Sequence, residues 1–365
     1  MWIYEWFIVL RDIKMEKTTV LLGAGAMIPY GGPTTNELTQ RLLDNKECNG
    51  FFNPIYYRTN ENANFEFLLS SIESLLDWKL ANEDNNSELL TSNILLEPIY
   101  EYKYRSKWDI WKIYKEAIND IIERIKDYDN FISFNIEKYK SLVDYISNEK
   151  QKSSIKIYSL NYDRLIPRIA SKHGINFYEG IGNNGYEYNL RKFATHPSTF
   201  FNLHGSIYTS LVSGDVFKIF DTPIELEYLQ KINGGNPGED KLFLPIIAGY
   251  SKSQRIMSEP FNLGIAAFMN DCNTCSRLVI VGYSFGDPYI NSILKRFIKF
   301  DSTEIIIIDY YEGEHLSDAF RGIPYLVFGI PQAKFIGEGS FLCLDKNHRI
   351  KLYLGGIEKY MTEFV

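Results

Sequence analysis

Hydrophobic residues follow one pattern in the two outer parts of the chain and another in the middle. The outer parts contain short apolar runs in which neighbouring residues are nearly all hydrophobic. These runs are Thr18–Leu22, Ile155–Leu160, Phe200–Leu203, Leu278–Val281 and Glu304–Ile308. Unbroken runs, as opposed to alternating apolar and polar residues, are typical of strands buried on both faces, and so they predict a parallel sheet.

In the middle of the chain, apolar residues recur every three or four positions, which is the spacing of a helix. The repeating positions are Phe65, Leu68, Leu69, Ile72 and Leu76, and then Trp111, Tyr114, Ala117, Ile118, Ile121 and Ile122. Glycine is absent from Phe51 to Gln151, and polar breaks such as Asn82–Asn86 separate the segments. The pattern predicts several helices inserted between two strands.

These patterns together predict an α/β fold: a Rossmann-like parallel sheet with helices on both faces, plus a helical insertion. We assign residues 15–48 and 152–365 to the sheet domain and residues 49–151 to the insertion. Residues 1–14 are either an N-terminal extension or a misassigned start, with Met15 as the true first residue.

Composition narrows the classes of function. The net charge is -7 and the pI about 5.5, which gives no support for direct nucleic-acid binding. Four cysteines in 365 residues do not make a disulfide framework, so we expect reduced thiols and a cytoplasmic protein. No apolar run approaches the roughly 18 residues of a membrane helix, and Met1–Leu10 lacks the basic leader and cleavage site of a signal peptide.

Polar and glycine residues follow the predicted strands. Gly23-Ala24-Gly25 comes between a strand and a helix, the order that seats phosphates on backbone N–H groups, although a tight turn needs the same residues. Thr34 and Glu37 fit a capping box for that helix. Asn161-Tyr162-Asp163 ends a strand, where an amide and a carboxylate suit a ribose and the group leaving it.

Three more strand ends carry candidate chemistry. His204, beside Gly205, could act as a general base, or it could be structural. Asp309 could receive ribose hydroxyls or be a solvated strand end. In the loop after Val281, Ser284 could donate to a phosphate or ribose, whereas Asp287 before Pro288 favours a helix cap.

A metal site is not expected. Cys272-x-x-Cys275 would bind zinc only together with a second pair, and the remaining cysteines, Cys48 and Cys343, are isolated. We expect the Cys272 pair at a helix end just before the strand at Leu278. The chain also lacks a metal-binding His pair, a Walker loop and a serine nucleophile elbow.

In this order, the motifs resemble the sirtuin family, and specifically the bacterial defence-associated sirtuin-like NADases. The stretch from Gly23-Ala24-Gly25 to Gly31-Gly32-Pro33 is similar to the sirtuin phosphate loop. Asn161-Tyr162-Asp163 resembles the Gln-Asn-Ile-Asp signature, His204-Gly205 the catalytic His-Gly, and Gly282-Tyr283-Ser284 the Gly-Thr-Ser strand end. The resemblance covers about residues 17–48 and 152–312.

Two departures separate the chain from the protein-deacylating sirtuins. Thr34-Thr35-Asn36 stands where deacylases carry Asp-Phe-Arg, and the zinc ribbon expected between His204 and Gly282 is missing. Because the zinc module helps form the acyl-lysine cleft, its loss argues against deacylation.

The resemblance implies NAD⁺ as substrate, no zinc, and hydrolysis to nicotinamide and ADP-ribose in antiphage defence by NAD⁺ depletion. It implies Asn161, His204 and Asp163 as catalytic residues. It implies NAD⁺ binding by a second set: Gly23, Ala24, Gly25, Pro33, Tyr283, Ser284 and Asp309. The alternatives are a non-catalytic NAD⁺ or ADP-ribose sensor and, third, an NAD⁺-dependent deacylase.

The same resemblance implies control by assembly. Unregulated NAD⁺ hydrolysis would kill the cell, so we expect a homo-oligomer, a HerA-type hexameric ATPase partner, or both. We expect no membrane association.

Overall fold

The computed structural model describes residues 16–81, 102, 104–132, 140–180, 190–212, 216–219, 246–248, 256–257, 260–297, 303–310, 333–337, 340–343 and 350–364. Residues 1–15 and the glycine-rich segment at 233–238 lie outside these ranges. No described helix is long and apolar enough to cross a membrane.

An eight-stranded sheet forms the centre of the described structure, in the order β3-β2-β1-β6-β7-β10-β9-β8. The strands are Ser198–Asn202 (β3), Ser153–Ser159 (β2), Glu16–Leu22 (β1), Arg277–Val281 (β6), Glu304–Ile308 (β7), Ile350–Tyr353 (β10), Ser340–Cys343 (β9) and Ala333–Gly337 (β8). The first six are parallel, and β9 and β8 form an antiparallel edge. A separate hairpin pairs Thr209–Val212 (β4) with Val216–Ile219 (β5).

The order of the parallel strands is that of a Rossmann fold. From β1 the chain builds β2 and β3 on one side and then returns to place β6, β7 and β10 on the other. The reversal between β1 and β6 is the topological switch point, where ligands of such sheets bind at the carboxyl ends of the strands. The predicted fold class is confirmed.

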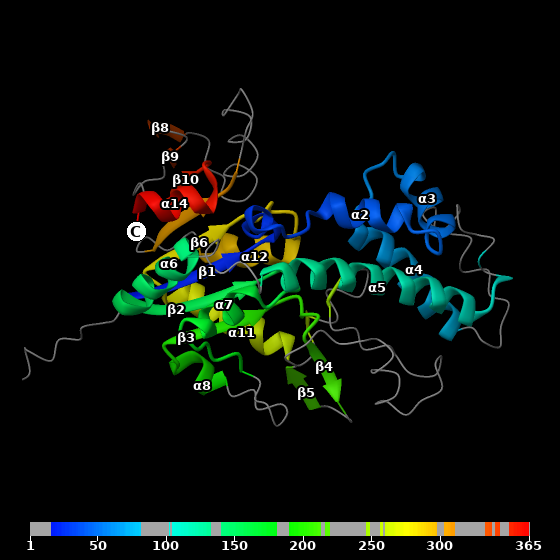
Figure 1. The fold of residues 1–365 in the computed structure, drawn as a ribbon, viewed down its shortest axis with the longest axis horizontal. Helices are drawn as coiled ribbons and strands as arrows, with labels where there is room; N and C mark the ends of the chain where they lie inside the picture. Colours follow the sequence, from blue (N-terminus) through cyan, green and yellow to red (C-terminus); the bar gives the residue numbers. More distant parts are fainter. Residues whose placement is uncertain are drawn as a thin grey trace, which may run out of the picture.

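Helices cover both faces of the sheet (Figure 1). One face packs on Leu190–Thr195 (α8), Phe261–Thr274 (α11) and Pro288–Phe297 (α12), with Leu21, Leu278 and Ile280 pointing towards them. The other face packs on Lys140–Lys152 (α6), Leu165–Lys172 (α7) and Gly356–Phe364 (α14), with Val20, Val279 and Ile157. Alternate residues of each strand are therefore buried on opposite faces, which explains the unbroken apolar runs.

The predicted insertion contains helices that build a second core. Asn49–Arg58 (α3), Phe65–Ala81 (α4) and Lys107–Ile132 (α5) pack on one another and on Thr35–Asp44 (α2). We call α3, α4 and α5 the helical module, and Figure 1 shows it extending from one side of the sheet. Helix α6 lies in the same predicted insertion but packs against β2 and α14.

The segment between β1 and α2 differs from the prediction in two details. Two short 3-10 turns, Ala24–Ala26 (η1) and Ile28–Tyr30 (η2), precede α2. Thr34 caps α2 as expected, because its Oγ accepts from the N–H of Glu37 at 3.0 Å. The second contact of the predicted capping box, from the N–H of Thr34 to the Glu37 side chain, is wrong. The Glu37 carboxylate instead pairs with Arg124 of α5. Arg124 also donates to the carbonyl of Gly31 at 3.1 Å.

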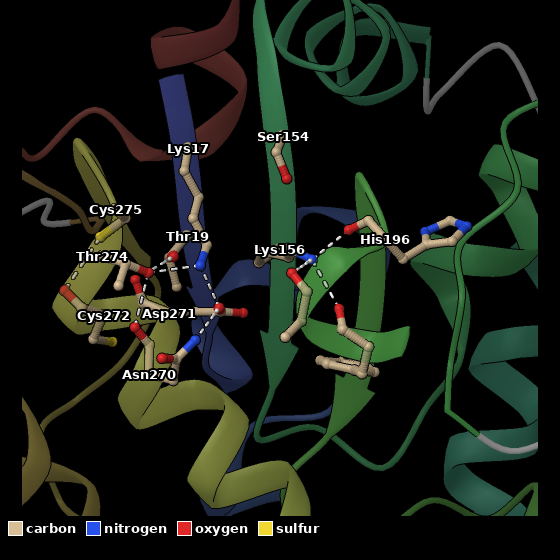
Figure 2. A network of polar contacts seen from close by, with 12 residues as sticks. Lys17, Thr19, Ser154, Lys156, His196, Asn270, Asp271, Cys272, Thr274 and Cys275 are labelled. Carbon is tan, nitrogen blue, oxygen red and sulfur yellow. Dashed lines mark hydrogen bonds and ion pairs between the residues drawn. The ribbon is translucent and has the colours of Figure 1, made fainter. Parts of the chain in front are cut away.

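A network of polar contacts, drawn in Figure 2, joins β1 to α11 and β2 to the end of α8. Asp271 accepts from Lys17 Nζ at 2.5 Å and from the Tyr158 hydroxyl at 2.6 Å. Lys156 Nζ donates to the main-chain carbonyls of Phe193, Ala194 and His196, at 2.9 and 3.3 Å for the first two. Burial lowers the pKa of Lys156 to about 8.

The cysteine pair lies at the end of α11, as expected. Cys275 caps the helix, and both Cys272 and Cys275 are buried. Burial raises the pKa of Cys275 to about 11 and that of Cys272 well above its usual value, so neither thiol is reactive at neutral pH. Among the described residues, no group of His, Cys, Asp and Glu side chains could hold a metal ion.

Candidate functional site

A cavity of about 420 Å³ lies at the carboxyl ends of the parallel strands, at the switch point. Every residue proposed above for catalysis or NAD⁺ binding lines it: Gly23, Ala24, Gly25, Pro33, Asn161, Asp163, His204, Tyr283, Ser284 and Asp309. These residues come from widely separated parts of the chain. The sheet brings them together because the carboxyl ends of parallel strands share one edge.

The order of the strands sets the order of the side chains along this edge. His204 follows β3, Asn161 follows β2, the loop at Gly23 follows β1, and Asp309 follows β7. Neighbouring strands are about 4.8 Å apart, so the row from β3 to β7 spans roughly 19 Å. A site of this shape suits an extended ligand with chemically different ends.

Three glycines let the loops after β1 and β6 touch. A Cβ on Gly23 would lie 2.5 Å from the carbonyl oxygen of Gly282, and a Cβ on Gly25 would lie 2.8 Å from the Gly282 Cα. Gly282 itself has φ +57, and a Cβ there would be 2.0 Å from the nitrogen of Ala26. Only glycine fits these positions without moving the backbone.

This contact corrects the expected role of the first glycine loop. The N–H of Gly23 donates to the carbonyl of Val281, and the N–H of Gly25 donates to that of Gly282, both at 2.9 Å. These two donors therefore fix the loops to each other and are not directed at a phosphate. Ala24 is exposed to the cavity between them.

The Asn161-Tyr162-Asp163 turn is held from several sides. The Asn161 amide donates to the carbonyl of Gly23 at 3.1 Å, which ties the ends of β2 and β1 together. From β3, Asn202 Nδ2 donates to the carbonyls of Asn161 and Asp163, at 2.8 and 2.9 Å. Sequence reasoning missed Asn202, which belongs to an apolar run and gives no separate signal.

Asp163 has a structural role as well as a place in the cavity wall. Its Oδ1 accepts from the N–H of Leu165 at 3.0 Å, at the start of α7. The residue is only 6% exposed. One carboxylate oxygen is therefore committed to the helix start, and the side chain is held in a fixed orientation.

His204 is buried and faces a carboxylate. Its Nε2 lies 3.3 Å from Asp287 Oδ2, an ion pair whenever the imidazole is protonated. Asp287 Oδ1 caps α12 by accepting from the N–H groups of Tyr289 and Ile290, at 2.9 and 3.2 Å. The predicted cap is confirmed, but Asp287 also reaches the candidate base, which local sequence did not indicate.

Tyr283 and Ser284, in the loop after β6, and Asp309, after β7, also line the cavity. The Tyr283 hydroxyl accepts from the N–H of Asp287 at 3.3 Å and lies within donating distance of the Asp287 carbonyl and of Asn291 Oδ1 in α12, so it holds the loop against that helix. Ser284 is exposed to the cavity. Asp309 Oδ1 accepts from the N–H of Tyr310 at 2.9 Å, and burial raises the pKa of its carboxyl.

The helical module and α2 supply the remaining wall. Asn64, Phe65 and Glu66 at the start of α4 line the cavity, with Ile125 of α5 and the first residues of α2. The Tyr162 hydroxyl donates to Glu66 Oε1 at 3.4 Å. Sequence reasoning missed these residues because they lie in a segment that carries no nucleotide-binding motif.

Comparisons with known proteins find similarity to solved structures of sirtuins. No family model and no curated protein matches the chain. A structure described as "The Structural basis of Sirtuin Substrate Affinity" is 12% identical with a TM-score of 0.40, covering 99% of this chain and 97% of its own. "Structure of Sir2Tm bound to a propionylated peptide" is 12% identical with a TM-score of 0.39, covering 99% and 96%. With identity and TM-score this low, function has to be inferred from the geometry of this chain.

Proposed function

We propose that the protein hydrolyses NAD⁺ at the bond between nicotinamide and ribose, giving nicotinamide and ADP-ribose. The observation that carries this proposal is that His204, Asn161 and Asp163 line one cavity with two glycine loops at the switch point of a Rossmann sheet. Dinucleotides bind across such crevices. A base, an amide and a carboxylate at one end are suited to the ribose and its leaving group.

The diphosphate would be held by uncharged hydrogen-bond donors and the amino end of a helix. No Lys or Arg lines the cavity in the part of the chain that the structure describes. Because the N–H groups of Gly23 and Gly25 are engaged elsewhere, we assign this role to the N–H of Ala24, the Ser284 hydroxyl and the amino end of α2 at Thr35 and Asn36. Asp309 would accept from the hydroxyls of the adenosine ribose.

The reaction would take place at the β2 and β3 ends. The bond between the ribose C1′ and the nicotinamide nitrogen breaks, and the electron pair leaves with nicotinamide. A water molecule oriented by Asn161 adds to C1′, and its proton passes to His204 directly or through a ribose hydroxyl. Asp163 would accept a hydrogen bond from the carboxamide, and Asp287 would hold the imidazole and stabilise its protonated form.

An NAD⁺ cleavage assay tests the proposal. General acid–base catalysis is worth roughly 100- to 10,000-fold in rate, so His204→Ala should lose at least the lower factor. Asn161→Ala removes the group that orients the water and should lose on the order of 100-fold. His173→Ala, an exposed residue just after α7, is the matched control and should retain full turnover. Undiminished turnover in both site variants would reject the assignment.

The same assay separates the alternatives. NAD⁺ binding without product, with any partner present, would identify a sensor. Nicotinamide release that requires an acyl-lysine peptide would identify a deacylase.

We also propose that assembly controls the activity, as a homo-oligomer or with a HerA-type ATPase, in defence by NAD⁺ depletion. The particle mass and the turnover should both change when the ATPase is added. A monomer fully active alone would reject this regulation.

A further inference from the structure

We propose that Glu66, supplied by the helical module, makes the cavity selective for the positively charged nicotinamide ring. The inference rests on the proposed function and adds a specificity-determining residue to it. Its starting point is that one wall of the cavity belongs to α4 and α5, outside the sheet that carries the other candidate residues.

Contacts place Glu66 at the reactive end. Its Oε1 accepts from the Tyr162 hydroxyl at 3.4 Å, and Tyr162 lies between Asn161 and Asp163 in the turn that follows β2. Tyr162 is buried, and its main-chain carbonyl accepts from the Ser206 hydroxyl at 2.8 Å. The buried Tyr162 side chain therefore links the Glu66 carboxylate to the turn that carries Asn161 and Asp163.

The start of α4 is itself well anchored. The N–H of Phe65 donates to Thr39 Oγ1 of α2 at 2.9 Å, and Asn64 Oδ1 accepts from the N–H of Phe67 at 2.9 Å. Phe65 is buried in the core that α2 shares with the helical module. The position of Glu66 is thus set by α2 packing, and it does not depend on a ligand.

The charge at this end is negative. Glu66, Asp163 and Asp287 line it, and no Lys or Arg does so among the described residues. Burial, followed by the charge and the hydrogen bond of Glu66 and then by the charge of Asp287, raises the pKa of Tyr162 well above its usual value, so both cavity carboxylates act on the Tyr162 hydroxyl.

Glu66 is the carboxylate best placed to act on a ligand. Asp163 Oδ1 is engaged with the start of α7, and Asp287 is shared between the α12 cap and His204. Glu66 is half-buried and reaches the cavity from a different wall. A carboxylate there attracts the cationic ring of bound NAD⁺ and the positive charge that develops at C1′ as the bond breaks.

Comparing the binding of an oxidised and a reduced nucleotide separates the effect of ring charge from the effect of ligand shape. NADH has the same two ribose groups and diphosphate as NAD⁺ but a neutral nicotinamide ring. The probes are carba-NAD⁺, in which a methylene replaces the ribose ring oxygen and prevents hydrolysis, and its reduced form. Their Kd values are measured by calorimetry on the full chain, so the readout does not depend on turnover.

Wild type should bind the oxidised probe about 10-fold more tightly than the reduced one. Glu66→Gln should weaken the oxidised probe by about that factor and change the reduced one less than twofold. Glu66→Asp keeps the charge and should keep the preference. Glu123→Gln, which removes a carboxylate from the exposed side of α5, is the matched control and should change neither value.

An equal loss of affinity for both probes in Glu66→Gln would show that Glu66 acts through the shape of the cavity, and it would overturn the charge assignment. An unchanged affinity for both probes would overturn it as well. If Glu66→Gln fails to fold, the comparison of Glu66→Asp with Tyr162→Phe decides. Glu66→Asp should keep the preference. Tyr162→Phe, which removes the hydrogen bond to the carboxylate, should weaken the oxidised probe and change the reduced one less than twofold. Loss of the preference in Glu66→Asp, or an equal change or no change of both probes in Tyr162→Phe, would overturn the charge assignment. A wild type that binds neither probe would instead reject the proposed function together with this inference.

Discussion

Two groups of buried polar residues on the same sheet have opposite surroundings. The cavity group consists of His204, Asp287, Asn161 and Asp163, and the network of Figure 2 centres on Lys156 and Asp271. Both contain side chains that are almost fully buried: His204 is 3% exposed, Lys156 1% and Asp271 1%. The cavity group borders about 420 Å³ of open space, whereas Lys156 and Asp271 are hydrogen-bonded to protein groups and do not line that cavity.

The difference shows that burial and a shifted pKa do not by themselves identify a functional residue. Lys156, with a pKa lowered to about 8, would rank high in a search for reactive lysines. Its ammonium group is instead bound to the carbonyls at the end of α8, where a cation also interacts favourably with the helix dipole. Access to a cavity distinguishes a candidate site from a structural network, and this can be tested by substitution.

The largest expected effect is on stability, from Asp271→Ala. The change leaves the buried Tyr158 hydroxyl and the partly exposed Lys17 Nζ without their shared acceptor. Removing one partner of a buried ion pair should lower the free energy of unfolding by about 3 kcal/mol. Urea unfolding measures it, and turnover per folded molecule should stay unchanged. If Asp271→Ala were as stable as wild type but impaired in turnover, Asp271 would belong to the functional site and not to a structural network.

The next effect is on catalysis, from Asp287→Asn. An asparagine still caps α12, so stability should change by less than 1 kcal/mol. Loss of the carboxylate 3.3 Å from His204 should reduce kcat on the order of 10- to 100-fold, with KM little changed.

The pH profile separates positioning from a structural role in this variant. Without Asp287 the protonated imidazole loses its partner, so the acid limb of the kcat/KM profile should move to lower pH. An unchanged profile with lower turnover would mean that Asp287 acts only as a cap.

The effect that is smallest at neutral pH is a pH dependence of stability, seen by comparing wild type with Lys156→Met. Burial lowers the pKa of Lys156 from 10.5 to about 8, so between these values the unfolded chain binds more protons than the folded one. The contribution of Lys156 to the free energy of unfolding therefore rises with pH from about 8 to 10.5. The free energy of unfolding of wild type minus that of Lys156→Met should therefore increase with pH over this window. A flat difference would show that Lys156 has the same affinity for protons in both states.

Much of the fold and the site follows from local sequence. Leu278–Val281 and Glu304–Ile308 predict strands because a residue buried on either face must be apolar whichever way it points. Asn161, His204 and Asp309 stand out because polar residues that directly follow such runs are placed at the carboxyl edge of the sheet. Thr34 and Asp287 are recognisable as caps because a cap depends only on residues three or fewer positions away.

The sequence by itself therefore determined β1, β2, β3, β6 and β7, the helices α2, α4 and α5, and the row of polar residues at one edge of the sheet. Only the tertiary structure decided that Asp287 meets His204, that Val281 and Gly282 accept from the N–H groups of Gly23 and Gly25, and that Glu66 reaches Tyr162 from 96 positions away. The physical reason is the distance along the chain over which each signal acts. Periodicity and capping act within a few residues, whereas these contacts depend on how the sheet and the helical module pack, for which no short segment carries a signal.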